Sequence, residues 1–183
     1  MATSGAGGKS KRWESGKGVD MAGLSKTSGG ELRPGEVPIE LPADVDACVY
    51  FIGRIRTPFA TLKDCPKNIR EGAAEALIEI DPRYAMGLHG LERCSHLIVL
   101  YWLDASRRDL VMQSPRHADR PRGVFALRSP IRPNPIGLAV VELVSVSAST
   151  LVVRNLDCRD GTPLIDIKPY FASIDSVPHA RRP

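Results

Sequence analysis

The feature that most constrains the fold is a series of short apolar runs, separated by turn-forming residues, that begins at Cys48. The runs are rich in Val, Ile, Leu and aromatic residues, which is typical of half-buried β-strands. Turn formers such as Asp81-Pro82 and Asp160-Gly161-Thr162-Pro163 lie between them. The predicted strands are Cys48–Arg56, Ala76–Ile80, His96–Leu103, Gly123–Leu127, Leu138–Val146, Thr150–Leu156 and Leu164–Lys168.

Helical signal is thin by comparison. We expect helical turns only at Ile69–Ala76, near Arg83–Leu91, and at the polar segment Ala105–Met112. The runs Val140–Val146 and Thr150–Leu156 are joined by a short Ser/Ala link and predict a hairpin. A doubly wound nucleotide-binding fold is excluded, because it needs long helices between strands and a glycine fingerprint after the first strand. The sequence therefore predicts a mainly β protein, an antiparallel barrel or sandwich with few short helices.

The N-terminal region differs in composition from the rest. Up to about residue 40 it is rich in Gly, Ser, Lys and Glu and has few large apolar side chains. Such a segment cannot bury enough surface to offset chain entropy. We therefore expect a flexible tail over residues 1–45 and one domain over residues 46–183, for which the length is sufficient.

The bulk properties restrict partners and compartment. Lys and Arg number 25 against 21 Asp and Glu, a mild surplus that permits contact with RNA but does not require it. The four cysteines have no Cys-x-x-Cys spacing, and we expect free thiols in a reducing compartment. No apolar run is long enough to span a bilayer, and no secretory signal opens the sequence. We expect a cytoplasmic protein without membrane contact.

The densest unusual stretch is Arg128-Ser-Pro-Ile-Arg-Pro-Asn-Pro-Ile-Gly137. Its prolines fix φ and restrict the residues before them, so the loop is stiff. Arginine on a stiff loop suits bidentate binding of a carboxylate or phosphate. The alternative is a rigid connector with solvated arginines. The pattern favours an anion-binding loop, and leaves Arg132 and Asn134 open between loop architecture and substrate.

A second cluster surrounds the turn Asp160-Gly161, a dipeptide that is most often purely structural. Acidic residues, Lys168 and Tyr170 lie within one strand–turn–strand. Alternation on the second strand brings Asp166 and Lys168 to one face. That pair is either part of a site or an ordinary surface ion pair.

Histidine and cysteine residues raise the question of a metal. The candidates are His89, Cys94, His96 and His117. Their spacing matches neither a structural nor a catalytic zinc site. We expect no metal.

Six motifs follow one another between about Tyr50 and Asp175. In chain order they are Ile52–Phe59, Gly90–Leu97, Gly123–Gly137, Leu156-Asp157, Asp160–Pro163 and Asp166–Tyr170. Each motif is modest alone, and the ordered set is specific. Together they resemble the TsaA-like family, which includes the tRNA (adenine-N6)-methyltransferase TrmO.

The resemblance implies a small antiparallel barrel that forms a homodimer and binds S-adenosylmethionine near the subunit interface. The methyl group would go to N6 of threonylcarbamoyladenosine beside the tRNA anticodon. Carried over by motif, the implied cofactor contacts are Arg128, Leu138, Cys158, Arg159, Asp160 and Gly161, with weaker correspondences at Pro66, Lys67, Asn68, Asp104 and Ala105.

Two departures from the family pattern bear on function. Family members commonly carry Pro-Arg-Gln where this sequence has Pro66-Lys67-Asn68, which shortens the amide side chain. The enteric-type enzyme has a C-terminal domain, whereas this sequence ends at Pro183, so we expect a short form. That domain bears on tRNA binding, so two alternatives to the tRNA substrate stay open. One is methylation of a small molecule or another RNA, and the other is a regulatory cofactor-binding module without catalysis.

The chemistry suggests roles within this site. Arg128 suits the carboxylate of the cofactor, and Asp160 could bind an amino group or ribose hydroxyl. The acceptor nitrogen is a poor nucleophile, and a base near it would help to remove its proton. Asp166 and Tyr170 are the candidates for that base. Phosphate contacts are expected from Arg54, Arg56, Arg107, Arg108, Arg116, Arg120 and Arg122.

Overall fold

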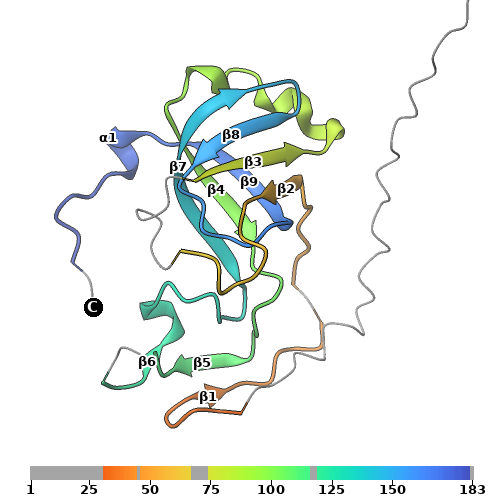
Figure 1. Cartoon of the computed structure of the whole chain (residues 1–183). Coiled ribbons are helices and arrows are strands. Elements are labelled where there is room, and N and C mark those ends of the chain that lie inside the picture. Colours follow the sequence, from red (N-terminus) through yellow and green to blue (C-terminus); the bar gives the residue numbers. More distant parts are fainter. Residues whose placement is uncertain (1–30, 45, 67–73, 116–118, 182–183) are drawn as a thin grey trace, which may run out of the picture. The chain divides into compact units, whose positions relative to one another are not determined.

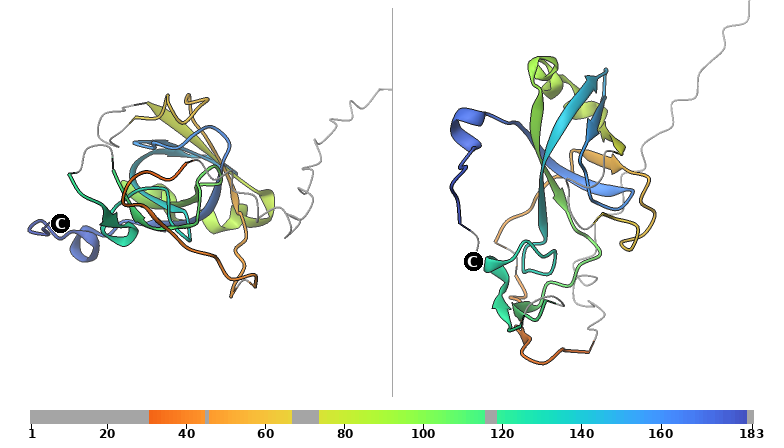
Figure 2. Two further views of the ribbon diagram at one scale, coloured as in Figure 1. Left: turned by 90° about the horizontal axis from the view of Figure 1, so that it is seen from below. Right: turned by 60° about the vertical axis from the view of Figure 1, so that its left-hand side comes forward.

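The computed structural model describes residues 31–44, 46–66, 74–115 and 119–181. Six antiparallel strands close into a barrel in the order β2-β3-β8-β7-β4-β9, and Figures 1 and 2 show them curving round a common interior. The predicted small β-barrel with few helices is confirmed. The barrel strands are β2 (Gly53–Arg56), β3 (Glu75–Ile80), β4 (His96–Trp102), β7 (Ile136–Val146), β8 (Thr150–Arg154) and β9 (Thr162–Pro169).

Strand β4 lies between β7 and β9 and positions the residues that matter below. Tyr101 pairs with Gly137 of β7, and Leu100 pairs with both Leu138 and Asp166. The predicted hairpin is confirmed as β7–β8, which contains a register shift between Leu143 and Ser145. The strand predicted from Cys48 begins only at Gly53, although the backbone of Ile52 still bonds to Leu164 of β9 and to Asp81.

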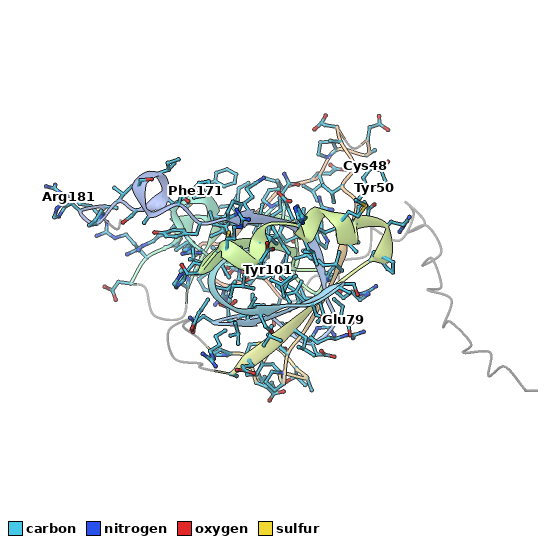
Figure 3. The ribbon with its side chains drawn as sticks, turned by 90° about the horizontal axis from the view of Figure 1, so that it is seen from above. Cys48, Tyr50, Glu79, Tyr101, Phe171 and Arg181 are labelled. Atoms are coloured by element: carbon cyan, nitrogen blue, oxygen red, sulfur yellow. The ribbon has the colours of Figure 1, made fainter. Side chains whose placement is uncertain are left out.

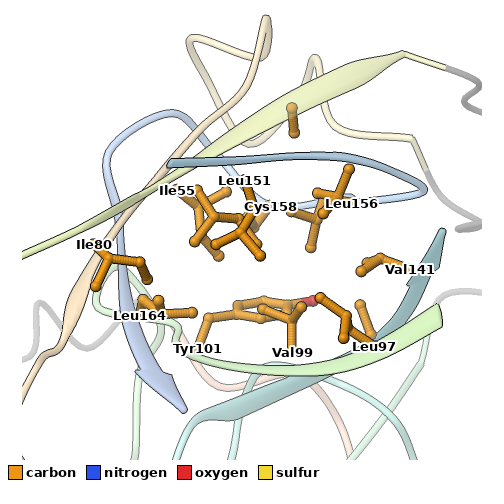
Figure 4. Packing of buried hydrophobic residues seen from close by; sticks show 14 of the residues in the cluster. Ile55, Ile80, Leu97, Val99, Tyr101, Val141, Leu151, Leu156, Cys158 and Leu164 are labelled. Atoms are coloured by element: carbon orange, nitrogen blue, oxygen red, sulfur yellow. The ribbon is translucent and has the colours of Figure 1, made fainter. Parts of the chain in front are cut away.

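Alternating side chains of the strands fill the barrel. Ile55, Ile78, Val99, Leu151 and Leu164 are fully buried, as period-2 patterning requires of a sheet with one inner face. Figure 4 shows the ring of Tyr101 in this packing, beside Val99 and Leu164. Closure of the sheet leaves no open edge.

A second, three-stranded sheet has the order β1-β5-β6. Its strands are β1 (Val37–Pro38), β5 (Leu110–Gln113) and β6 (Arg122–Gly123), so the described part of the expected tail includes a strand. The polar helical turn predicted at Ala105–Met112 is wrong. Leu110 is buried, and the carbonyl of Asp109 accepts a hydrogen bond from the Ile39 amide at 2.8 Å. Pairing with β1 therefore outweighs the polar local pattern.

Short helices complete the fold. The predicted turn near Arg83–Leu91 is confirmed as the 3₁₀ helices η3 (Pro82–Leu88) and η4 (Leu91–Arg93). The predicted strand Gly123–Leu127 is wrong after its first residue, because η5 (Val124–Ala126) follows. A single helical turn, α1 (Ala172–Asp175), lies near the C-terminus. Most of the predicted turn Ile69–Ala76 lies outside the described residues, and Ala76 belongs to β3.

In the C-terminal segment after β9, large apolar side chains are exposed. Phe171 is 54% exposed and Ile174 is 74% exposed. Figure 3 shows Phe171 and Arg181 outside the barrel, with Tyr101 near its centre. Across the part of the chain that the structure describes, no helix has the length and apolarity to cross a membrane.

Candidate functional site

The segment Arg159–Thr162 forms a tight turn where β9 begins. The amide and hydroxyl of Thr162 donate to the carbonyl of Arg159, at 3.3 Å and 2.6 Å. Gly161 has φ of +77°, which favours glycine there. Its amide donates to the carbonyl of Ile55 at 2.9 Å. The turn is thereby fixed to the end of β2.

Asp160 uses its polar groups to hold this turn in place. Its amide donates to the carbonyl of Phe59 at 2.8 Å, and its Oδ1 accepts from the amide of Thr57 at 3.2 Å. Its Oδ2 lies 3.8 Å from the guanidinium of Arg56. Both carboxylate oxygens therefore have partners in the chain.

Cys158 is buried beside the turn. The residue is only 3% exposed, and its carbonyl accepts from the hydroxyl of Thr57 at 2.9 Å. Burial raises the pKa of the thiol to about 12. A buried, neutral thiol is a poor nucleophile, so this environment does not favour covalent catalysis.

Arg159 connects two segments that the sequence analysis assigned separately. Its guanidinium lies 3.4 Å from the carboxylate of Asp104. Asp104 and Ala105 are exposed and follow β4 directly. Arg159 and Asp104, which are far apart in the sequence, therefore meet at one end of the barrel.

Arg128 and Leu138 also meet. The Nη2 group of Arg128 donates to the carbonyl of Leu138 at 3.0 Å, and both residues are exposed. One bond uses one of the five N–H donors of the guanidinium. The remaining donors can hold a carboxylate or phosphate.

Tyr101 and Asp157 form a contact at this end of the barrel that sequence reasoning missed. The Tyr101 hydroxyl donates to Oδ1 of Asp157 at 2.8 Å. Burial, and then the negative charge of Asp157, raise the pKa of Tyr101, while the positive charge of Arg128 lowers it. Arg128 is therefore close enough to interact with this pair. A tyrosine at an inward position of β4 was the available signal.

The proline-rich loop is held by Arg132. Its guanidinium donates to the carbonyls of Ser129 at 3.0 Å and Val124 at 3.1 Å, and also to that of Leu127. These bonds satisfy carbonyls that a strand would have paired, which explains the helical turn η5 in place of the predicted strand. Arg132 thus supports the loop. Asn134 is exposed, and its carbonyl accepts from the amide of Ile136.

The two candidate bases lie in different places. Asp166 is on the outer side of the barrel, in one row with Leu100 and Leu138, and its carboxylate lies 2.7 Å from the ammonium of Lys168. The expected common face of Asp166 and Lys168 is thus observed. Tyr170 donates its amide to the carbonyl of His96, at the opposite end of β4 from Tyr101.

Two further predictions can be placed only in part. Pro66 is half-buried, whereas Lys67 and Asn68 lie outside the described residues. The charge of Asp157 raises the pKa of the Cys65 thiol and that of Arg159 lowers it, so residue 65 lies near the turn. Among the residues whose placement is described, which exclude His117, no group of three or more metal-binding side chains occurs.

The family of the tRNA-methyltransferase O N-terminal domain matches residues 54–176. The chain belongs to the TrmO N-terminal domain family. The family resemblance inferred from the motifs is therefore confirmed, and it is a methyltransferase family. The match includes every predicted site residue.

Relatives of this TrmO-type chain extend the comparison. The probable S-adenosyl-L-methionine-binding protein VirR of Rhizobium radiobacter is 46% identical, over 75% of this chain and 79% of its own length. A probable S-adenosyl-L-methionine-binding protein of Methanothermobacter thermautotrophicus is 44% identical, over 74% of this chain and 98% of its own. Both names carry the cofactor that the motifs implied.

Solved TrmO structures share the fold. TrmO from Pseudomonas aeruginosa superimposes with a TM-score of 0.63 at 35% identity, covering 75% of this chain and 62% of that one. This TrmO-type chain thus spans about three fifths of the solved enzyme.

Proposed function

We propose that this protein is an S-adenosylmethionine-dependent methyltransferase that methylates N6 of threonylcarbamoyladenosine next to the anticodon of tRNA. The supporting observation is the convergence of Arg128 on Leu138 and of Arg159 on Asp104, in a chain of the TrmO N-terminal domain family. These four residues come from three separate segments of the chain.

The residues at this end of the barrel suit the cofactor. Arg128 has free donors for a carboxylate, and the exposed Leu138 side chain offers an apolar surface. The turn at Gly161 carries no side chain, so a ligand can approach its backbone. Bound S-adenosylmethionine supplies a methyl group activated by a sulfonium. The chain's own contribution is to orient the acceptor in line with that group.

Asp166 is the better placed of the two candidate bases within one chain. It is two strands away from Leu138 in the same outer row, roughly 10 Å at the usual strand spacing. Its carboxylate lies 2.7 Å from the ammonium of Lys168, and a carboxylate so placed can accept a proton from the acceptor nitrogen. Tyr170 lies about 17 Å along β4 from Tyr101, at ~3.4 Å per residue. We therefore assign Tyr170 to the site of a second subunit.

The proposed homodimer has a suitable surface. Outward-facing Ile136, Leu138 and Val140 on β7 are 41%, 44% and 38% exposed. A contiguous apolar row on a sheet is typical of an interaction surface. Pairing of two copies through this row would bring Leu138 and Asp166 to the interface.

The predicted phosphate-binding arginines differ in availability. Arg54, Arg56, Arg107 and Arg108 bind groups of the chain itself, namely Gly161, Glu79, Asp109 and Pro133. Arg116 lies outside the described residues. Arg120 and Arg122 are exposed, and their side chains make no hydrogen bond or ion pair within the described residues. We propose these two as the phosphate contacts.

A second function is favoured by one comparison. The chain covers 98% of a relative named only as a cofactor-binding protein, but 62% of a solved TrmO. The same barrel could therefore act on a small molecule or another RNA, or bind the cofactor without catalysis.

Two measurements separate these functions. Titration calorimetry with S-adenosylmethionine should show binding that Arg128→Ala weakens. Mass spectrometry of tRNA nucleosides from a deletion strain should show unmethylated threonylcarbamoyladenosine, restored by the wild-type gene and not by Arg128→Ala. Cofactor binding together with unchanged tRNA would leave only the second function.

A further inference from the structure

Tyr101 is an inward-facing residue with a polar end. Its ring is buried in the core, 4% exposed, and its hydroxyl reaches Oδ1 of Asp157 at 2.8 Å. Gly137, opposite on β7, leaves room for the ring, because a β-carbon there would lie 2.2 Å from the ring atom Cε2. A hydroxyl fixed by so rigid a ring orients the carboxylate that it binds.

That contact engages only one of the two carboxylate oxygens of Asp157. Within the described parts of the chain, Oδ2 of Asp157 has no hydrogen-bond or ion-pair partner and is not buried without one. Asp160, three residues later, differs, because Thr57 and Arg56 engage its two oxygens. Of these two carboxylates, Asp157 is therefore the one with an oriented acceptor oxygen that the chain does not use.

Arg128 supplies the opposite charge nearby. It is bound to the carbonyl of Leu138, the residue after Gly137. The Tyr101 ring therefore extends from the strand position beside the Arg128 contact to Asp157. The positive charge of Arg128 also acts on the Tyr101 hydroxyl, whose pKa it lowers. A cation and an anion thus flank the same aromatic ring at one end of the barrel.

We propose that Arg128 and Asp157 form one subsite for a zwitterionic α-amino acid group, with the ligand carboxylate on Arg128 and its ammonium on Asp157. Tyr101 is the positioning residue that fixes Asp157. The inference rests on the proposed function, since the cofactor ends in such a group. It replaces Asp160 with Asp157 as the partner of the amino group.

Opposite charges at both ends select a zwitterion over a simple anion or cation. Hydrogen bonds to charged groups are stronger than neutral ones. A ligand that lacks either charge should lose the corresponding contact, and only that contact. The subsite can therefore be tested by removing charges from the ligand and from the protein in turn.

The experiment is calorimetric titration of the full chain with three ligands. S-adenosylmethionine has both charged groups, decarboxylated S-adenosylmethionine keeps only the amine, and methylthioadenosine has neither. The variants are Asp157→Asn, Tyr101→Phe and Arg128→Ala. Glu142→Gln is the matched carboxylate control, because Glu142 on β7 is half-exposed and forms an ion pair with Arg154 on β8.

Asp157→Asn should weaken binding of the two amine-bearing ligands by about 10- to 100-fold and leave methylthioadenosine unchanged. Tyr101→Phe should weaken the same two ligands by a smaller factor. Arg128→Ala should weaken S-adenosylmethionine alone, and Glu142→Gln should weaken none.

Equal affinity of Asp157→Asn and wild type for S-adenosylmethionine would overturn the subsite, as would an equal loss for all three ligands. If Asp157→Asn does not fold, Tyr101→Phe decides by the same pattern, because it keeps the ring. Absence of binding by the wild type to every ligand would instead refute the proposed function, and the subsite with it.

Discussion

The ring of Tyr101 lies across the backbone of Gly137, so closely that a β-carbon at residue 137 would meet the ring at 2.2 Å. The two residues face each other on neighbouring strands. The same ring carries the hydroxyl that binds Asp157. The glycine that ends the proline-rich motif therefore connects barrel packing to the geometry of the candidate site.

Gly137→Ala should destabilise the protein. The added methyl group must displace the ring or the strand, and overpacking of a core costs about 1–3 kcal/mol. Urea unfolding measures the difference. Gly123→Ala is the control, because a β-carbon at Gly123 meets no atom within 4 Å and its φ is −59°. Equal stability of the two variants would contradict the proposed close contact.

Substitutions of the two arginines of the proline-rich loop should have different effects, one on stability and the other on cofactor binding. Arg132→Ala removes three donor contacts to backbone carbonyls, and should lower the free energy of unfolding by roughly 1.5–3 kcal/mol. Arg128→Ala removes one exposed contact and should change it by less than about 0.5 kcal/mol, while weakening cofactor binding. The reverse pattern would exchange the two assigned roles.

The barrel was predictable because its signals are local. Apolar runs such as His96–Leu103 and Thr150–Leu156 alternate with the period of a strand, and turn residues separate them. The failures at Ala105–Met112 and Gly123–Leu127 have a common cause. Pairing of residue 109 with Ile39, and of Arg132 with three carbonyls, depends on contacts across the chain. No local pattern contains such contacts.

The sequence predicts the residues of the candidate site as a set of motifs, but it does not contain their geometry. The sequence could not show that the carboxylate of Asp160 is already bound by Thr57 and Arg56. It also gave no reason to join Tyr101 to Asp157, since the two are 56 residues apart and Tyr101 lies outside the motifs. Which of several carboxylates is free depends on packing, and packing is a property of the folded chain.

Acid should destabilise the protein in part through Asp81. Hydrogen bonds from the Arg83 side chain and backbone lower the pKa of its carboxyl. Because the folded-state pKa is below the unfolded value of about 3.9, the stabilisation is complete above that pH and is lost as pH falls through the folded value.

The stability gap between wild type and Asp81→Asn should therefore narrow between pH 7 and pH 3. Thermal unfolding midpoints across this range measure it. Asp119→Asn, at an exposed residue with no hydrogen bond to the described chain, serves as the control. A gap independent of pH would refute this role of Asp81.

Cys158 should resist modification in the folded protein. Burial raises the pKa of its thiol to about 12, so only about one molecule in ten thousand carries the thiolate at pH 8. Exposed Cys48 should react rapidly with Ellman's reagent, and Cys48→Ser should remove that rapid phase. Rapid labelling of Cys158 before unfolding, located by peptide mass spectrometry, would contradict its burial.

The apolar row on β7 should hold two copies of the chain together. Val140 is 38% exposed on the outer face of β7, and β7 lies between β4 and β8 in the barrel. In a two-fold symmetric interface, Val140→Asp introduces its charge twice, and burying an unpaired carboxylate is costly. Sedimentation equilibrium should find a dimer for wild type and a monomer for Val140→Asp.

The control variant Met86→Asp, at a 92% exposed residue of η3, should remain dimeric. Cofactor affinity should fall only in Val140→Asp if the site adjoins the interface, whereas a monomeric wild type would refute the dimer.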